Sequence, residues 1–157
     1  MVSLRGIIIF LLFISMFSII SMAQGIDYYT NPQLREEYKS ICEEWSKAGN
    51  NPLLLEEVIQ KFREFAERNS HNVYSAISLF NIGQIYHYSN PEKAKEYYRK
   101  ALDKILQNRS EWIGEDYDVT FENDASASIE YGGLSAIRLA IFYFKDGDTT
   151  TSINLLR

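Results

Sequence analysis

The sequence predicts an all-α protein of antiparallel helical hairpins, with about six helices. Only three prolines and eight glycines occur in 157 residues, so few positions interrupt a helix. All three prolines follow an asparagine, at positions 31–32, 51–52 and 90–91. Asparagine is a favoured N-cap and proline is favoured at the first helical position, so each pair predicts a helix start. Apolar residues recur at helical spacing after each start.

These starts and the apolar stripes between them predict three hairpins, over residues 32–68, 73–107 and 124–156. The expected helices cover residues 32–48, 52–68, 73–88, 91–107, 124–145 and a short last segment that starts at Thr149 or Thr150. Gly49 is expected to end the first helix. The turns between helices are short, which requires antiparallel neighbours. The centre of the fifth helix, residues 134–144, is apolar nearly all round, as in a helix covered on most sides.

Residues 108–123 have no helical stripe and contain an acidic group of side chains. We interpret this segment as a connector between the second and third hairpins. Its apolar residues Trp112, Ile113 and Phe121 are expected to pack on the neighbouring hairpin.

The N-terminus has the three-part layout of a secretory signal. A start with Arg5 is followed by an uncharged apolar run over residues 6–20 and by Ser21-Met22-Ala23. We therefore expect a signal peptide over residues 1–23, cleavage before Gln24, and a helical domain over residues 24–157. Cleavage changes the formal charge from −5 to −6, because Arg5 is lost and no acid is. The alternative is an uncleaved membrane anchor.

The expected location is therefore the periplasm or the exterior of a bacterial cell, with membrane contact only through the signal segment before its removal. The charge of −5 and the lack of a Lys/Arg run argue against nucleic acid as a partner. The single cysteine, Cys42, excludes an intramolecular disulfide. Its helical spacing with Tyr38 and Trp45 favours a small buried hydrophobe, and the alternative is a reactive or dimer-forming thiol.

The sequence contains no recognisable catalytic or metal-binding pattern. His71 and His87 lack the Cys, His or acid spacing of a zinc site. Asp116 and Asp118 lack the glycine and terminal glutamate of a calcium loop. A phosphate loop and a nucleophile motif are also missing. We therefore expect no catalytic residue, no metal, no cofactor and no enzymatic activity.

Residues 75–106 contain the most complete pattern of the chain. Their first helix contains Leu79, Ile82-Gly83 and Tyr86, and their second contains Ala94, Tyr98 and Ala101. This arrangement resembles the tetratricopeptide repeat, a helix-turn-helix unit of about 34 residues. The resemblance implies a right-handed superhelix of hairpins packed through Leu79, Gly83, Tyr86, Ala94, Tyr98 and Ala101. A non-repeat helical bundle is the alternative.

Two weaker copies of the pattern flank this hairpin, at Tyr38, Ile41-Cys42 and Trp45 and at Ala136, Leu139-Ala140 and Tyr143. In the repeat family, the first helices of successive hairpins line a concave face that holds a peptide or a partner helix. The corresponding residues here are Ile77, Phe80, Gln84, His87, Tyr88, Ile137, Ile141 and Phe144. The alternative for each is packing on neighbouring helices.

The predicted function is that of an exported, non-enzymatic scaffold that binds a peptide or a partner protein. The alternative is a structural subunit of an envelope assembly, in which a partner chain completes the C-terminal hairpin and an oligomer forms through it. This alternative depends on Ile153, Leu155 and Leu156, which are too few to cover the apolar fifth helix.

Overall fold

The computed structural model of the chain describes residues 32–108 and 124–157. These residues form six α-helices and no strand, which confirms the predicted all-α class. The predicted signal segment and the connector, with Trp112, Ile113 and Phe121, lie outside the described residues. The chain divides into two units, Met1–Arg35 and Glu36–Arg157. In the first unit, the structure describes the opening turn of the first helix. The packing described below is that of the second unit.

The observed helix bounds follow the Asn-Pro, glycine and asparagine signals closely. The six helices are α2 (Pro32–Ala48), α3 (Pro52–Arg68), α4 (Val73–Tyr86), α5 (Pro91–Gln107), α7 (Asp124–Lys145) and α8 (Thr149–Leu155). Helix α4 ends two residues earlier than predicted. Residues 87–89 form a turn instead, in which the His87 N–H donates to Gln84 O (3.2 Å) and the Asn90 N–H donates to Tyr86 O (2.8 Å).

Side-chain caps explain why the helices begin where they do. Asn51 Oδ1 accepts hydrogen bonds from the backbone N–H groups of Leu53 (3.0 Å) and Leu54 (3.4 Å). Asn90 Oδ1 does the same for the backbone of Lys93 (3.1 Å). These bonds satisfy donors that the first turn of a helix leaves without a partner. Gly49 ends α2 with φ of +55°, a conformation in which glycine has no Cβ penalty.

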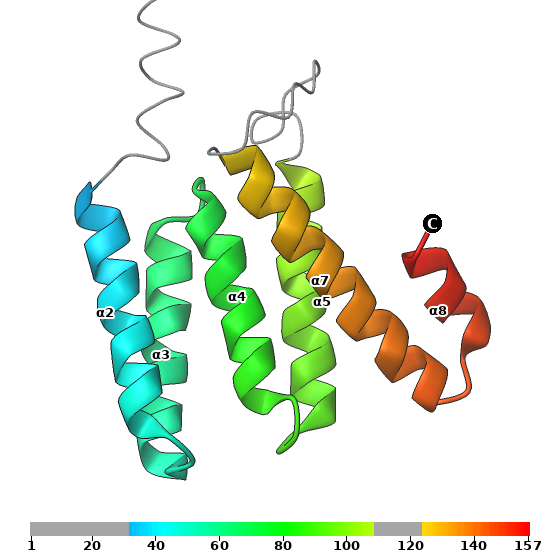
Figure 1. Cartoon of the computed structure of the whole chain (residues 1–157), viewed down its shortest axis with the longest axis horizontal. Helices are drawn as coiled ribbons and strands as arrows, with labels where there is room; N and C mark the ends of the chain where they lie inside the picture. Colours follow the sequence, from blue (N-terminus) through cyan, green and yellow to red (C-terminus); the bar gives the residue numbers. More distant parts are fainter. Residues whose placement is uncertain (1–31, 109–123) are drawn as a thin grey trace, which may run out of the picture. The chain divides into compact units, whose positions relative to one another are not determined.

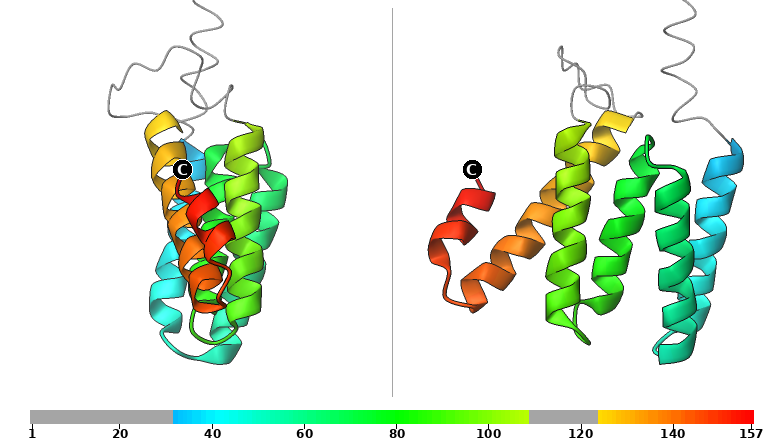
Figure 2. Two further views of the ribbon diagram at one scale, coloured as in Figure 1. Left: turned by 90° about the vertical axis from the view of Figure 1, so that its right-hand side faces the viewer. Right: turned by 180° about the vertical axis from the view of Figure 1, so that it is seen from behind.

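The helices pair into hairpins that lie side by side (Figure 1). Figure 1 shows α2, α4 and α7 at the front, and the view from behind in Figure 2 brings α3 and α5 forward. Ring contacts join α2 to α3, with Trp45 6.1 Å from Phe62 between centroids. Helix α4 packs against α3, α5 and α7, and α7 packs against α5 and α8.

The core runs through successive hairpins. Phe62 and Phe65 of α3, Ile82 of α4, Tyr98 of α5 and Leu139 of α7 are all fully buried. A cluster of buried residues also joins α4 to α5, with tyrosines from α2, α4 and α7 packed against it. Its members are Val73, Ala76, Ile77 and Ile105, with Tyr38, Tyr74 and Tyr131 around them.

Candidate functional site

The residues expected to pack the central hairpin meet around Tyr98. A Cβ atom added to Gly83 would lie 2.8 Å from Cδ1 and Cε1 of Tyr98, so α4 passes directly over this ring. Tyr98, Ala94 and Ala101 are fully buried, Tyr86 is 7% exposed, and Leu79 is partly buried. The absence of a side chain at Gly83 therefore leaves the space that the Tyr98 ring needs.

A polar chain extends from Tyr98 toward the surface. The Tyr98 hydroxyl donates to Gln84 Oε1 (3.0 Å), and His87 Nδ1 lies 3.1 Å from the same hydroxyl. The phenol has a single hydrogen, so a bond from the hydroxyl to Gln84 leaves its oxygen to accept from His87 Nδ1 in the tautomer that carries the proton on this nitrogen. Burial raises the pKa of Tyr98 to about 12, although the positive charge of Arg138 opposes the shift.

Helix α7 presents an apolar stripe to solvent. Ile137, Ile141 and Phe144 are 48%, 40% and 65% exposed. They lie on the side of the helix opposite to Leu139, and both Leu139 and Phe142 are buried, at 0% and 8% exposed. The expectation that α7 is covered on most sides therefore holds toward α4, α5 and α8, while one face is open. We refer to Ile137, Ile141 and Phe144 as the α7 stripe.

The five predicted contact residues of α4 and its following turn are placed differently from one another. Tyr88 is 93% exposed, and Gln84 and His87 are partly buried. Ile77 and Phe80, in contrast, are only 4% and 3% exposed, so the structure does not leave them open to a partner. For these two residues the alternative of packing on neighbouring helices applies.

The burial of Phe80 and Ile77 has a clear cause in helices distant along the chain. Helix α7 lies against α4, and the ring of Tyr131 meets that of Phe80 edge-on at 5.3 Å. Ile77 is enclosed in the cluster with Ile105 of α5. The repeat pattern alone does not specify how closely α7 approaches α4.

Two cations that the sequence analysis did not select lie beside the α7 stripe. Arg138 and Lys145 are on the side of α7 that carries Phe142, whose ring is 5.1 Å from that of His87. Burial lowers the pKa of His87, and the charges of Arg138 and Lys145 lower it further. The sequence shows that Arg138 and Lys145 lie four and three residues from Phe142. It does not show that Phe142 lies close to His87.

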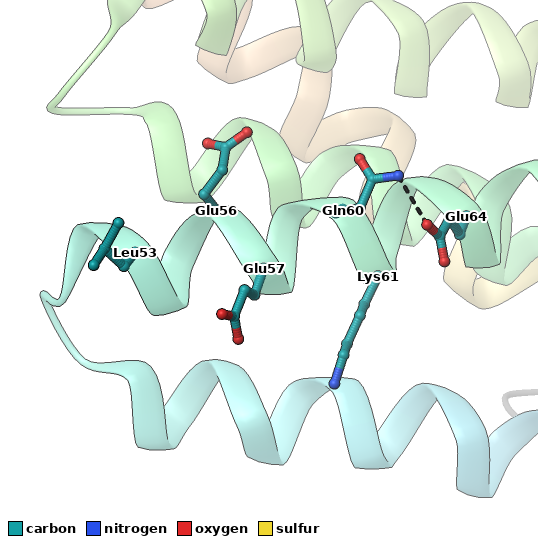
Figure 3. A pocket seen from close by; sticks show the side chains of 6 residues that line it. All are labelled: Leu53, Glu56, Glu57, Gln60, Lys61 and Glu64. Carbon is teal, nitrogen blue, oxygen red and sulfur yellow. Dashed lines mark hydrogen bonds between the residues drawn. The ribbon is translucent and has the colours of Figure 1, made fainter.

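A hollow on the outer surface of α3 is lined by side chains of that helix alone (Figure 3). Its residues are Leu53, Glu56, Glu57, Gln60, Lys61 and Glu64. Gln60 donates to Glu64 Oε1 (2.8 Å), and Lys61 pairs with Glu44 of α2. These internal pairings are those of an ordinary solvated helix surface.

The thiol of Cys42 is partly buried on α2. Burial raises its pKa, which keeps it in the protonated and less nucleophilic form at neutral pH. Its partial exposure falls short of the full burial expected for a small core hydrophobe.

Across residues 32–108 and 124–157, no three histidine, cysteine, aspartate or glutamate side chains are grouped to hold a metal ion. None of the described helices combines the length and apolar character that a membrane span requires. Comparison of the chain with protein-family models, curated proteins and solved structures gave no match.

Proposed function

We propose that the protein is an exported helical-hairpin scaffold of the tetratricopeptide-repeat type that binds a peptide or partner protein without catalysing a reaction. The observation that supports this proposal is the α7 stripe. Its three large apolar side chains are exposed, whereas Leu139, Ala140 and Phe142 of the same helix are buried. Adjacent exposed apolar side chains on a folded chain are typical of an interaction surface.

The neighbouring surface extends the region available for recognition. Tyr88 is 93% exposed and its ring lies 4.7 Å from that of His87. Tyrosine combines a large apolar ring with a hydroxyl group and is enriched at protein interfaces. Tyr88 is therefore a second exposed apolar group available for recognition, next to the His87 ring that contacts Phe142 of α7.

Export is a separate part of the proposal and depends on the sequence of residues 1–23. The basic start, the apolar run and the small residues at 21 and 23 together support a cleavable signal.

The test for binding is site-specific photocrosslinking in the source cells. A photoreactive phenylalanine analogue replaces Phe144 in one variant and Leu53 in a control, since Leu53 is 76% exposed on α3. We expect a discrete crosslinked partner from position 144 that disappears when Ile141→Ser is added, and none from position 53. Equal crosslinking from both positions, or crosslinking insensitive to Ile141→Ser, would overturn the proposal.

A second candidate function is supported by α8. Ile153 and Leu156 of this hairpin are 47% and 61% exposed, so a partner chain could bury them together with α7. In that case the protein is a structural subunit of an assembly. Light scattering distinguishes the two functions, because a monomer with a cooperative melting transition excludes obligate assembly.

A further inference from the structure

Helix α7 presents two cations toward the end of α4. Arg138, Phe142 and Lys145 are spaced by four and three residues, which places them on one side of the helix. Phe142 identifies the direction of that side, because its ring lies 5.1 Å from His87 and 6.3 Å from Tyr98. Arg138 and Lys145 therefore flank this aromatic contact, one on either side along the helix.

The electrostatics of His87 agree with this placement. Both cations lower the pKa of His87, in addition to the larger effect of its burial. The imidazole is therefore held neutral, and the positive charge of this surface comes from α7.

Neither cation is neutralised inside the described part of the chain. Arg138 and Lys145 form no ion pair with any described acid. The acid that follows Lys145, Asp146, is instead held by Lys95 of α5 at 2.8 Å. Within residues 32–108 and 124–157, these two positive charges therefore have no paired acid, although the formal charge of the protein is −5.

The cations lie at the edge of the α7 stripe, about a quarter-turn around the helix from it, on the side that faces the end of α4. Arg138 follows Ile137, and Lys145 follows Phe144, so each cation lies one step around the helix from an exposed apolar side chain. The two pairs are separated by seven residues, or about 10 Å along the helix axis. A ligand that matches them needs apolar side chains beside acidic groups two helical turns apart.

We propose that this surface binds an amphipathic helical segment of a partner protein, with acidic side chains at positions i and i+7 against Arg138 and Lys145 and apolar side chains on the α7 stripe. This inference rests on the proposed binding function and specifies the chemistry of its ligand. An anionic membrane is a poorer match. Recognition of an anionic lipid surface takes a cluster of about four to eight cations, whereas this part of α7 contributes two.

The test is selection from a phage-displayed library of helical peptides, followed by affinity measurements. The library randomises two successive turns beside a fixed leucine stripe, and the target is the protein expressed from its full gene. We expect enrichment of Asp and Glu at positions i and i+7. Arg138→Gln and Lys145→Gln should each weaken binding about two- to fivefold, and about tenfold together. Binding should also weaken as salt is added.

Matched variants separate this inference from the function on which it rests. Lys61→Gln removes the same charge from α3 and should leave the affinity unchanged, and all three variants should keep the melting temperature. Peptides that need Ile141 but show no acidic preference would overturn the inference and leave the binding function intact. Failure to select any peptide sensitive to Ile141→Ser would overturn both. If Arg138→Gln abolished binding to anionic vesicles or self-association but left peptide binding unchanged, the cations would serve a membrane or a second copy of the chain. That result would also overturn the inference.

Discussion

Replacement of Gly83 by alanine tests the packing at the centre of the fold. The new Cβ would lie 2.8 Å from two atoms of the Tyr98 ring and 3.2 Å from a third. The ring has little room to move, because Tyr98 is fully buried and its hydroxyl is bonded to Gln84. Phe80 also lies 5.4 Å from it between centroids. We therefore expect the overlap to cost about 3 kcal/mol, at the upper end for overpacking.

Helix propensity acts in the opposite direction. Alanine is better than glycine inside a helix by about 1 kcal/mol, so a net destabilisation of about 2 kcal/mol remains for Gly83→Ala. For a domain of this size, that corresponds to a melting temperature lower by roughly 6–10 °C. Thermal unfolding followed by circular dichroism is sufficient to detect such a change.

The control is Gly133→Ala on α7. A Cβ at Gly133 would meet no atom within 4 Å, so only the propensity gain remains and the melting temperature should rise by a few degrees. In a Tyr98→Leu background, Gly83→Ala should cost much less, because the ring that it meets is gone. A Gly83→Ala protein as stable as the wild type, or equally destabilised in both backgrounds, would refute the reasoning.

Four further predictions follow from the described contacts and the N-terminal sequence. Ser78→Ala should raise stability by about 0.5–1 kcal/mol in chemical denaturation, because the buried Ser78 hydroxyl has no hydrogen-bond partner among the described residues. Tyr38→Phe should lower it by about 1 kcal/mol, because Asn81 Nδ2 donates to the Tyr38 hydroxyl at 2.7 Å and is left without this acceptor. Stability should fall as pH rises from about 10 to about 12, because the unfolded chain ionises Tyr98 before the folded chain does, and denaturant midpoints across this range measure it. Intact mass of the exported protein should correspond to a chain that starts at Gln24.

The helix bounds could be predicted because their signals are local. Asn51 and Asn90 cap the helices that their prolines begin, and Gly49 has the positive φ expected after a helix. Each of these features depends on residues within one turn of the boundary. The packing residues of the central hairpin follow from equally local spacing, and Tyr86, Ala94, Tyr98 and Ala101 are buried.

The arrangement of helices around α4 could not be predicted in the same way. The repeat resemblance put Ile77 and Phe80 on a face expected to contact a partner, with packing on neighbouring helices as the alternative, and both residues are buried. Phe80 is covered by Tyr131, which is far away along the chain and is brought close by the approach of α7 to α4. Periodicity reports which side of a helix is apolar, but it does not report which other helix covers that side.

Helix α7 shows how this limitation affects the candidate site. Its sequence is apolar on nearly every side, so residues that fold the protein cannot be told from residues that bind by pattern alone. The structure separates them, because Leu139 and Phe142 are buried while Ile141 and Phe144 are exposed. Substitutions at the exposed pair should therefore change binding without loss of the fold, whereas truncation of Leu139 would disturb both. This separation allows the proposed function to be tested on a protein that is still folded.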